Sequence, residues 1–256
     1  MQRKTSIVVA VVVAALIGII AYAALRPAPA KAPGAEAPTA PPVSFKEVTK
    51  YYDIGTNYPS STPLLASVGT SADIAAVARM KKFVDDTVAQ FKTDGNFDNL
   101  TPKDIQMLGF DQGRKEKLNI VYLIASSPRT VSYIFTTYED TLGAHGNTFF
   151  HTFTFDTSTG APLALVDLFT PGSDYLGALS SISRAKLPSV IGSSADMTFI
   201  TPGTTPEAKN FQNFFFDDQR LVILFAPYAV APYSSGPQTL PIPVNELSNI
   251  LKSEYR

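Results

Sequence analysis

The most constraining feature of the sequence is an aromatic run at residues 148–155, which reads Thr-Phe-Phe-His-Thr-Phe-Thr-Phe. In an extended chain the odd-numbered residues of this run share one face and the even-numbered residues share the other. Aromatic and β-branched residues in this alternation predict a strand that is buried on one face. The polar stretch 156–160 ends in Gly160, so we expect the chain to turn there and double back.

The segments around this run give the order of the other elements. Strands are predicted at residues 47–57, 118–125, 130–140 and 238–242, and a hairpin is predicted from 211–216 and 220–226. Helices are predicted at 70–95, 102–108, 174–187 and 243–255, with Thr70 and Asp73 as a capping box for the first and Thr101 as a cap for the second. This order lacks regular βαβ alternation, so the predicted fold is α+β, with mostly antiparallel sheets and flanking helices.

The N-terminal region has a different composition from the rest. Residues 7–25 are apolar and uncharged, and as a helix they are long enough for the roughly 30 Å hydrocarbon core of a bilayer. Arg3 and Lys4 precede this run and predict a cytoplasmic stub at 1–6, a single-pass signal anchor at 7–25 and an extracytoplasmic remainder. A cleaved signal peptide is the alternative, because Ala21 and Ala23 have the small–x–small spacing of a cleavage site. Residues 26–44 are rich in Pro and Ala and predict a disordered linker.

Composition excludes several classes of function. The chain of 256 residues has a net charge of -1, which is not the charge of a nucleic-acid-binding protein. It contains no Cys, so it has neither a disulfide framework nor a thiolate nucleophile. A phosphate loop, a dinucleotide fingerprint and a Gly-x-Ser-x-Gly elbow are all missing from the sequence. We therefore predict no cofactor.

One candidate site is the loop Gly-Ala-His-Gly-Asn at residues 143–147, which with the preceding residue supplies Leu142, His145 and Asn147. A histidine between glycines suits a binding loop or a general base near neutral pH, and the alternative is a structural His that caps the turn. No nucleophile or orienting carboxylate is fixed by the spacing. The positions of Asp140, His145 and His151 do not specify a metal site, and no metal is predicted.

A second candidate is the Pro/Gly-rich loop at residues 227–237, which carries Tyr228 and Tyr233. Rigid aromatic side chains on a restricted loop make good contacts for a protein or glycan partner. The alternative is that both tyrosines plug the end of a sheet. The acidic pairs at 139–140 and 217–218 are expected to be solvated, since adjacent strand residues face opposite sides and Asp is common in turns.

Three blocks of residues resemble a known family. They are Tyr138 with 143–147, the stretch 155–169, and the stretch 214–247, which includes the Phe-Phe-Phe-Asp-Asp run. Together they resemble the extracytoplasmic domain of the lysozyme-sensing anti-sigma factor RsiV, a domain that also forms the non-catalytic region of the deacetylase PdaC. Leu142 departs from the pattern, because related sequences more often have Gly there. The anti-sigma and deacetylase regions have no counterpart in this sequence, so sigma-factor regulation is not implied.

The resemblance implies an N-terminal α+β portion at residues 45–115 and a C-terminal RsiV-like domain at 116–256. It also implies an extracytoplasmic location and binding to a lysozyme-like hydrolase. We therefore expect a membrane-anchored, non-enzymatic binding module whose partner is such a hydrolase or peptidoglycan. Its candidate contact residues are Leu142, His145, Asn147, Tyr228 and Tyr233. The alternatives are a cell-wall-modifying enzyme, an accessory domain of one, or a module that only assembles with another membrane protein through its anchor.

Overall fold

A computed structural model describes residues 41–217 and 219–256, which belong to one compact unit. The predicted anchor at 7–25 and most of the linker predicted at 26–44 lie outside the described residues. Within the described ranges, no helix combines the length and the apolar character that a membrane span requires.

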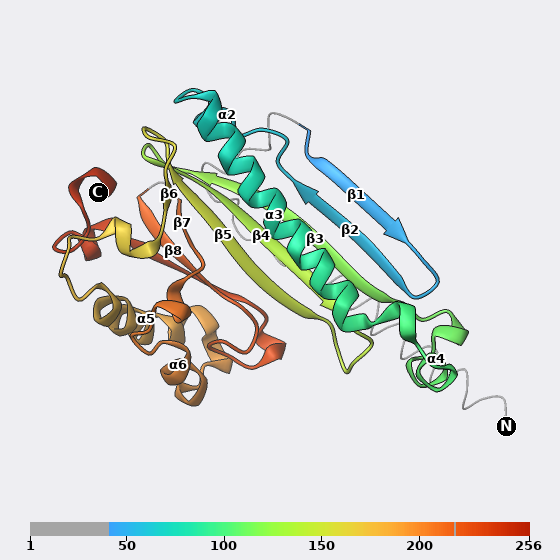
Figure 1. Cartoon of the computed structure of the whole chain (residues 1–256). Helices are drawn as coiled ribbons and strands as arrows, with labels where there is room; N and C mark the ends of the chain where they lie inside the picture. The colour runs from blue at the N-terminus through green and yellow to red at the C-terminus, as the bar shows by residue number, and fades with distance from the viewer. Residues whose placement is uncertain (1–40, 218) are drawn as a thin grey trace, which may run out of the picture. The chain divides into compact units, whose positions relative to one another are not determined.

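The main element is a six-stranded sheet in the order β1-β2-β3-β4-β5-β6 (Figure 1). Its strands are β1 (Val43–Val48), β2 (Tyr52–Tyr58), β3 (Glu116–Ser126), β4 (Thr130–Asp140), β5 (Asn147–Asp156) and β6 (Pro162–Leu163). Neighbouring strands are antiparallel except β2 and β3, which are parallel. The α+β prediction is confirmed, with a mixed rather than a purely antiparallel sheet.

The single strand predicted at residues 47–57 is wrong, because the chain turns between β1 and β2. The Thr49 hydroxyl oxygen accepts hydrogen bonds from the backbone N–H groups of Tyr51 and Tyr52, at 3.1 and 2.9 Å. A Thr side chain that bonds nearby backbone groups in this way favours a turn over a continuous strand.

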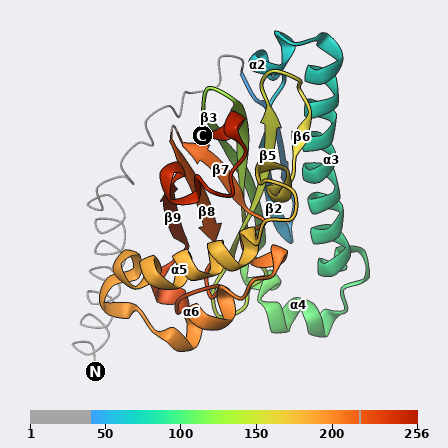
Figure 2. The same ribbon diagram turned by 90° about the vertical axis from the view of Figure 1, so that its left-hand side faces the viewer.

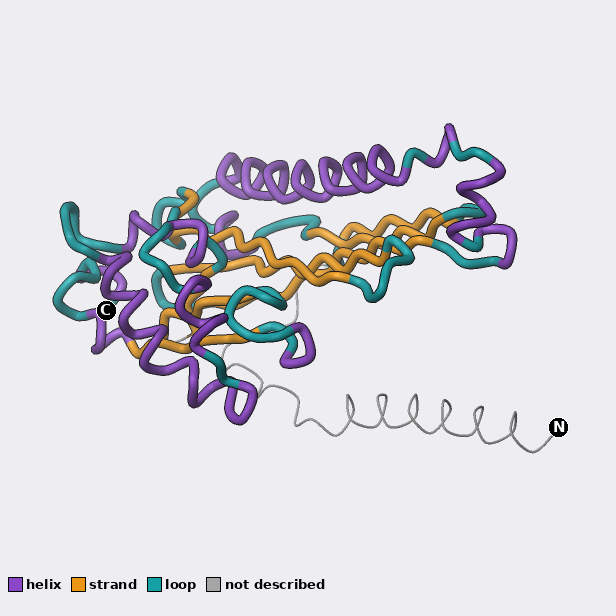
Figure 3. Tube along the Cα trace, turned by 90° about the horizontal axis from the view of Figure 1, so that it is seen from below, coloured by secondary structure: helices purple, strands orange, loops and turns teal. Residues whose placement is uncertain are grey.

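Helices cross over between the parallel strands β2 and β3, as a parallel connection requires. They are α2 (Pro63–Ala66), α3 (Thr70–Gly95) and α4 (Pro102–Leu108), and α3 lies along one face of the sheet (Figures 1 and 3). The helix buries Met80, Val84 and Phe91 against strand residues such as Leu118 and Phe135.

The bounds of α3 agree with the prediction, but its predicted capping box does not form. The N-cap is Gly69, and no side chain caps it. Asp73 instead accepts hydrogen bonds from the backbone N–H and the hydroxyl of the fully buried Thr62, the latter over 2.7 Å. The cap predicted at Thr101 is confirmed, because Thr101 and Asp104 form a reciprocal capping box.

A second sheet packs on the face opposite α3 (Figure 2). Its antiparallel strands are β7 (Phe214–Asp217), β8 (Arg220–Phe225) and β9 (Gln238–Pro243). The even-numbered residues of β5 face this sheet, as the alternation predicts: the Thr154 hydroxyl donates to the Phe214 carbonyl over 3.2 Å. On the odd-numbered face Phe155 is buried under α3, while Phe149 is 48% exposed.

Helices α5 (Tyr175–Ile191) and α6 (Met197–Gly203) contribute to the core on the outer face of the second sheet, near β9. The closing helix predicted at 243–255 is wrong. The chain forms short 3-10 turns at Val244–Leu247 and Ser253–Tyr255. Backbone bonds to distant segments replace the helical ones, since Val244 N–H donates to Gln219 and Lys252 N–H donates to Leu168.

Candidate functional site

The two loops predicted as candidate sites meet in space. One lies between β4 and β5 and carries His145, and the other lies between β8 and β9 and carries Tyr228 and Tyr233. The His145 ring stacks on the Tyr233 ring, with the centroids 3.8 Å apart and the planes at 18°. The Tyr233 hydroxyl donates to the carbonyl oxygen of Gly146 over 2.7 Å. We call His145, Tyr228 and Tyr233 the aromatic cluster.

Both ring nitrogens of His145 have partners. Nδ1 lies 3.1 Å from the Gly146 carbonyl oxygen, and Nε2 lies 3.2 Å from the Tyr228 hydroxyl oxygen. A carbonyl oxygen can only accept, so Nδ1 is assigned as the protonated nitrogen and Nε2 as the acceptor of the Tyr228 hydroxyl hydrogen. Tyr228 is 54% exposed and His145 is also exposed, so the cluster forms part of the surface.

Each loop contains a non-glycine residue with left-handed backbone geometry. Leu142 has φ 63° and Tyr228 has φ 68°, a conformation that costs a non-glycine residue roughly 1–3 kcal/mol unless its surroundings hold it. Leu142 is held at both backbone groups: its N–H donates to Asp140 over 2.9 Å and its carbonyl accepts from Arg114 over 3.3 Å. The left-handed geometry also explains why Gly suits this position in the family pattern.

Gly146 lets the loop lie against Tyr138. A Cβ at position 146 would lie 2.3 Å from the Tyr138 hydroxyl oxygen, whereas a Cβ at Gly143 would meet open space. Tyr138 is 37% exposed and borders the cluster. Burial, with smaller contributions from Asp140 and Tyr233, raises the pKa of Tyr138.

The remaining predicted residues lie apart from the cluster or only border it. Asn147 is exposed at the start of β5, and in the described part of the chain its side chain makes no hydrogen bond to the cluster. His151 stacks on Phe83 of α3, with ring centroids 4.6 Å apart. Among the described residues, no three His, Asp or Glu side chains are arranged to hold a metal ion.

Glu139 and Asp140 do not form an acid–base pair, and Asp218 of the second acidic pair lies outside the described residues. Asp140 caps the Leu142 N–H, while Glu139 lies in a groove beside Asp94 of α3. The expectation that the pair at 217–218 is solvated is wrong for Asp217, which is the last residue of β7, is 4% exposed and forms an ion pair with Arg220. Glu139 and Asp140 thus follow the expected divergence of adjacent strand residues.

Below the loop, Glu116 is a buried carboxyl at the start of β3. It is 5% exposed. Burial, together with the nearby charges of Glu139 and Asp140, raises the pKa of Glu116 to about 7. Its protonation therefore changes near neutral pH, close to the strand end from which the His145 loop begins.

Arg114, Tyr138 and Gly146 support the site but are missing from the residues predicted for it. The family pattern contains Tyr138 and Gly146 without a role for either. The position of Arg114 follows from the β3–β4 register, in which Lys117 lies opposite Asp140. Continuing that register by three residues places position 114 beside the loop, so a predicted hairpin register would have found it.

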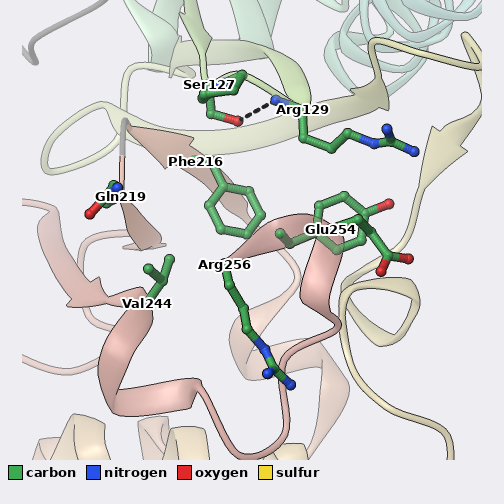
Figure 4. A pocket seen from close by; sticks show the side chains of 9 residues that line it. Ser127, Arg129, Phe216, Gln219, Val244, Glu254 and Arg256 are labelled. Carbon is green, nitrogen blue, oxygen red and sulfur yellow. Dashed lines mark hydrogen bonds between the residues drawn. The ribbon is translucent and has the colours of Figure 1, made fainter.

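A small pocket of about 80 Å³ lies elsewhere, beside the C-terminal residues (Figure 4). Several of its polar groups form hydrogen bonds that stabilise the fold. Arg129 and Tyr255 both donate to Asp156, over 3.0 and 3.3 Å, and burial beside this carboxylate raises the pKa of Tyr255 to about 12. The Arg256 guanidinium donates to the Leu251 carbonyl, and in the close view it points away from Arg129. Among the described residues that line this pocket, no charged groups converge.

Parts of the chain are similar in sequence to known proteins. A stretch of 177 residues is 31% identical to the peptidoglycan-N-acetylmuramic acid deacetylase PdaC of Bacillus subtilis, covering 69% of this chain and 36% of PdaC. A stretch of 107 residues is 29% identical to the esterase Rv3036c of Mycobacterium tuberculosis, covering 42% of this chain and 46% of the esterase. The chain therefore spans less than half the length of each of these curated relatives.

A crystal structure of a DUF3298 family member from Bacteroides fragilis has the same fold. It superposes with a TM-score of 0.55 at 18% identity, covering 84% of this chain and 93% of that chain. Residues 166–245, which run through the second sheet and include Tyr228 and Tyr233, match the family model described as "Protein of unknown function (DUF3298)". The resemblance to PdaC is thus confirmed, and it is accompanied by the DUF3298 match over residues 166–245.

Proposed function

We propose that this chain is an extracytoplasmic binding module that contacts a component of the cell envelope through the aromatic cluster. The observation that carries the proposal is the stacking of His145 on Tyr233, with Tyr228 closing the cluster. These three side chains come from loops of two different sheets and meet at the surface, where His145 and Tyr228 are exposed and Tyr233 is half-buried.

The physical reason is preorganisation. Exposed tyrosines give a large contact area at a low cost in side-chain entropy, and hydrogen bonds already fix the rings. Leu142 and Tyr228 have left-handed backbone conformations that are strained for non-glycine residues. Such strain persists mainly at binding or catalytic sites, which favours a functional role for the two loops.

The proposed location and anchor rest on the sequence of residues 1–25, with an apolar run preceded by Arg3 and Lys4. The proposed partner is peptidoglycan or a lysozyme-like hydrolase that acts on it. Similarity to a peptidoglycan deacetylase supports an envelope ligand.

The test is retention of the full-length chain, in mild detergent, on insoluble peptidoglycan and on immobilised lysozyme. The proposal expects retention on at least one of the two at micromolar concentrations, with release by excess soluble ligand. If neither material retains the chain, the proposed partner is wrong.

A second candidate function is hydrolysis of an ester or amide of a wall component. It is favoured by one contact, the 3.2 Å separation of His145 Nε2 from the Tyr228 hydroxyl oxygen, and by the esterase and deacetylase names of the relatives. A base beside a hydroxyl is the first requirement of nucleophilic catalysis. Against it, the hydrogen bonds of the His145 ring go to a carbonyl and a phenol, so no carboxylate of residues 41–217 or 219–256 orients the imidazole.

An assay with p-nitrophenyl acetate and with acetylated peptidoglycan fragments separates the two functions. The binding proposal expects no turnover above that of a His145→Ala variant. Turnover that this substitution removes would establish the enzyme.

A further inference from the structure

The turn between α2 and α3 exposes apolar side chains at one end of the described unit (Figure 1). Leu64, Val68 and Ile74 are all exposed there. A helical turn continues from α2 to Gly69, whose N–H bonds to the Leu65 carbonyl, so Leu64 and Val68, four residues apart, share one side. Ile74 follows on the second turn of α3. We call Leu64, Val68 and Ile74 the apolar corner.

Charged side chains are missing from this part of the sequence. Residues 54–72 contain no Asp, Glu, Lys, Arg or His. The first carboxylate after them, Asp73, already accepts hydrogen bonds from the buried Thr62. The next charged residue is Arg79, which is exposed more than one turn further along α3. An exposed apolar surface without charges is suited to the boundary of a bilayer, where an unpaired charge would be costly to bury.

The described part of the chain begins beside the apolar corner. The hydroxyl of Ser60, which lies shortly before α2, donates to the Pro41 carbonyl over 2.8 Å. In the sequence, the fifteen residues 26–40, rich in Pro and Ala, separate Pro41 from the anchor predicted at 7–25. An extended Pro-rich chain of this length spans about 45 Å. Such a tether keeps the corner near the bilayer and raises the effective concentration for a contact.

The aromatic cluster lies at the opposite end of the sheet. Strand β2 ends at Tyr58, two residues before Ser60, so it runs toward the apolar corner. Strand β3 is parallel to β2 and β4 is antiparallel to β3, so β4 runs away from the corner and ends at Asp140, beside the His145 loop. The eleven residues of β4 cover about 35 Å. A surface that holds the corner therefore leaves the aromatic cluster free.

We propose that the apolar corner rests on the bilayer that holds the chain's own anchor, and that this contact directs the aromatic cluster away from the membrane. Leu64, Val68 and Ile74 enter the boundary between the headgroups and the acyl chains. Because residues 54–72 carry no charge, the contact needs no anionic lipid and is not weakened by salt. This inference rests on the anchor in the proposed function, but not on the identity of the envelope ligand.

A single introduced Trp tests the contact, because the chain contains no Trp of its own. Val68→Trp places the reporter in the apolar corner. Met107→Trp is the matched control, since Met107 is an exposed apolar residue of α4, at the other end of α3 (Figure 1). Each full-length variant is reconstituted in phosphatidylcholine vesicles, with and without bromine on the acyl chains as a quencher of Trp. Bromine should reduce the emission of Val68→Trp at least about twofold and leave that of Met107→Trp unchanged.

A second set of variants separates the apolar contact from the effect of the tether alone. Leu64→Asp and Ile74→Asp, added together to Val68→Trp, should abolish the quenching, because the new charges oppose entry into the acyl region. Val48→Asp is the matched control, since Val48 is an exposed apolar residue at the far end of β1. Added to Val68→Trp, it should leave the quenching unchanged.

Flotation of the chain with the vesicles separates this inference from the proposed function. If the chain does not float, the proposed anchor and this inference are both wrong. If it floats but bromine quenches neither reporter, or quenches both equally, the anchor stands and the contact of the corner is overturned. Blue-shifted emission of Val68→Trp that bromine does not quench would also overturn the contact, because protein, such as a second copy of the chain, then covers the corner.

Discussion

The Tyr233 hydroxyl donates a 2.7 Å hydrogen bond to the Gly146 carbonyl oxygen, and the Tyr233 ring stacks on the imidazole of His145. This one side chain therefore connects the loop of the second sheet to the loop of the first. A ligand that contacts His145 meets a surface that is already ordered, which lowers the entropy cost of binding.

Replacing Tyr233 with Phe removes this hydrogen bond and keeps the stacked ring. We expect the free energy of unfolding to fall by about 1 kcal/mol, the usual value of a partly buried hydrogen bond. Urea denaturation measures the loss, and amide exchange in residues 143–147 should become faster. Unchanged exchange in this loop would show that the hydroxyl does not order it.

The two glycines of the His145 loop are predicted to respond differently to the same methyl group. Gly146→Ala places a Cβ against Tyr138, so the ring must move, and we expect a loss of about 1–3 kcal/mol in stability. Gly143→Ala is the matched control, because its Cβ would meet open space. Thermal unfolding of both variants checks the prediction, and equal losses would contradict the packing of Gly146 on Tyr138.

Glu116 makes stability depend on pH. Its pKa in the folded protein is about 7, against 4.5 for a free Glu side chain, so the folded state binds more protons between these values. The contribution of Glu116 to the free energy of unfolding is therefore greatest below about pH 4.5. This contribution falls by up to about 3 kcal/mol as the pH rises through about 7. Glu116→Gln removes the charge, so the variant should exceed the wild type in stability at about pH 8 and not at about pH 5.

Urea titrations at the two pH values measure this difference. Glu254→Gln serves as the control, since Glu254 is an exposed carboxyl in the turn that closes the chain. An equal gain for Glu116→Gln at both pH values would show that the buried carboxyl does not titrate between them.

Asp73 is predicted to stabilise the fold through Thr62 rather than through the helix cap. Thr62 is fully buried and donates both its backbone N–H and its hydroxyl to this carboxylate. Asp73→Ala leaves two buried donors without a partner, and we expect a loss of about 1–3 kcal/mol in unfolding free energy. Asp86→Ala, which removes only an exposed ion pair on the same helix, should change stability by less than about 0.5 kcal/mol.

Local patterns in the sequence predicted much of the fold. The 26-residue helix α3, the helix cap at Thr101 and the alternation of β5 all follow from spacing within a few residues. The sequence also predicted the two loops that form the aromatic cluster, although not that they meet. Their contact depends on the packing of the second sheet against β3, β4 and β5, which no local pattern specifies.

The errors have the same origin. At the C-terminus, a segment with helical spacing forms 3-10 turns because its backbone bonds to Gln219 and Leu168. At the start of α3, Asp73 bonds Thr62, eleven residues earlier, instead of capping its own helix. In both places a contact outside the segment outweighs the local preference.

The most direct test of the central claim compares retention on peptidoglycan and on lysozyme for the wild-type chain, for Tyr228→Ala and for Phe45→Ala. Both substitutions remove an exposed aromatic ring, and Phe45 lies on β1, outside the aromatic cluster. We expect Tyr228→Ala to weaken retention at least about tenfold, as for an aromatic contact residue at the centre of an interface, and Phe45→Ala to leave retention unchanged. Equal retention of the wild type and both variants would contradict the aromatic cluster as the contact surface.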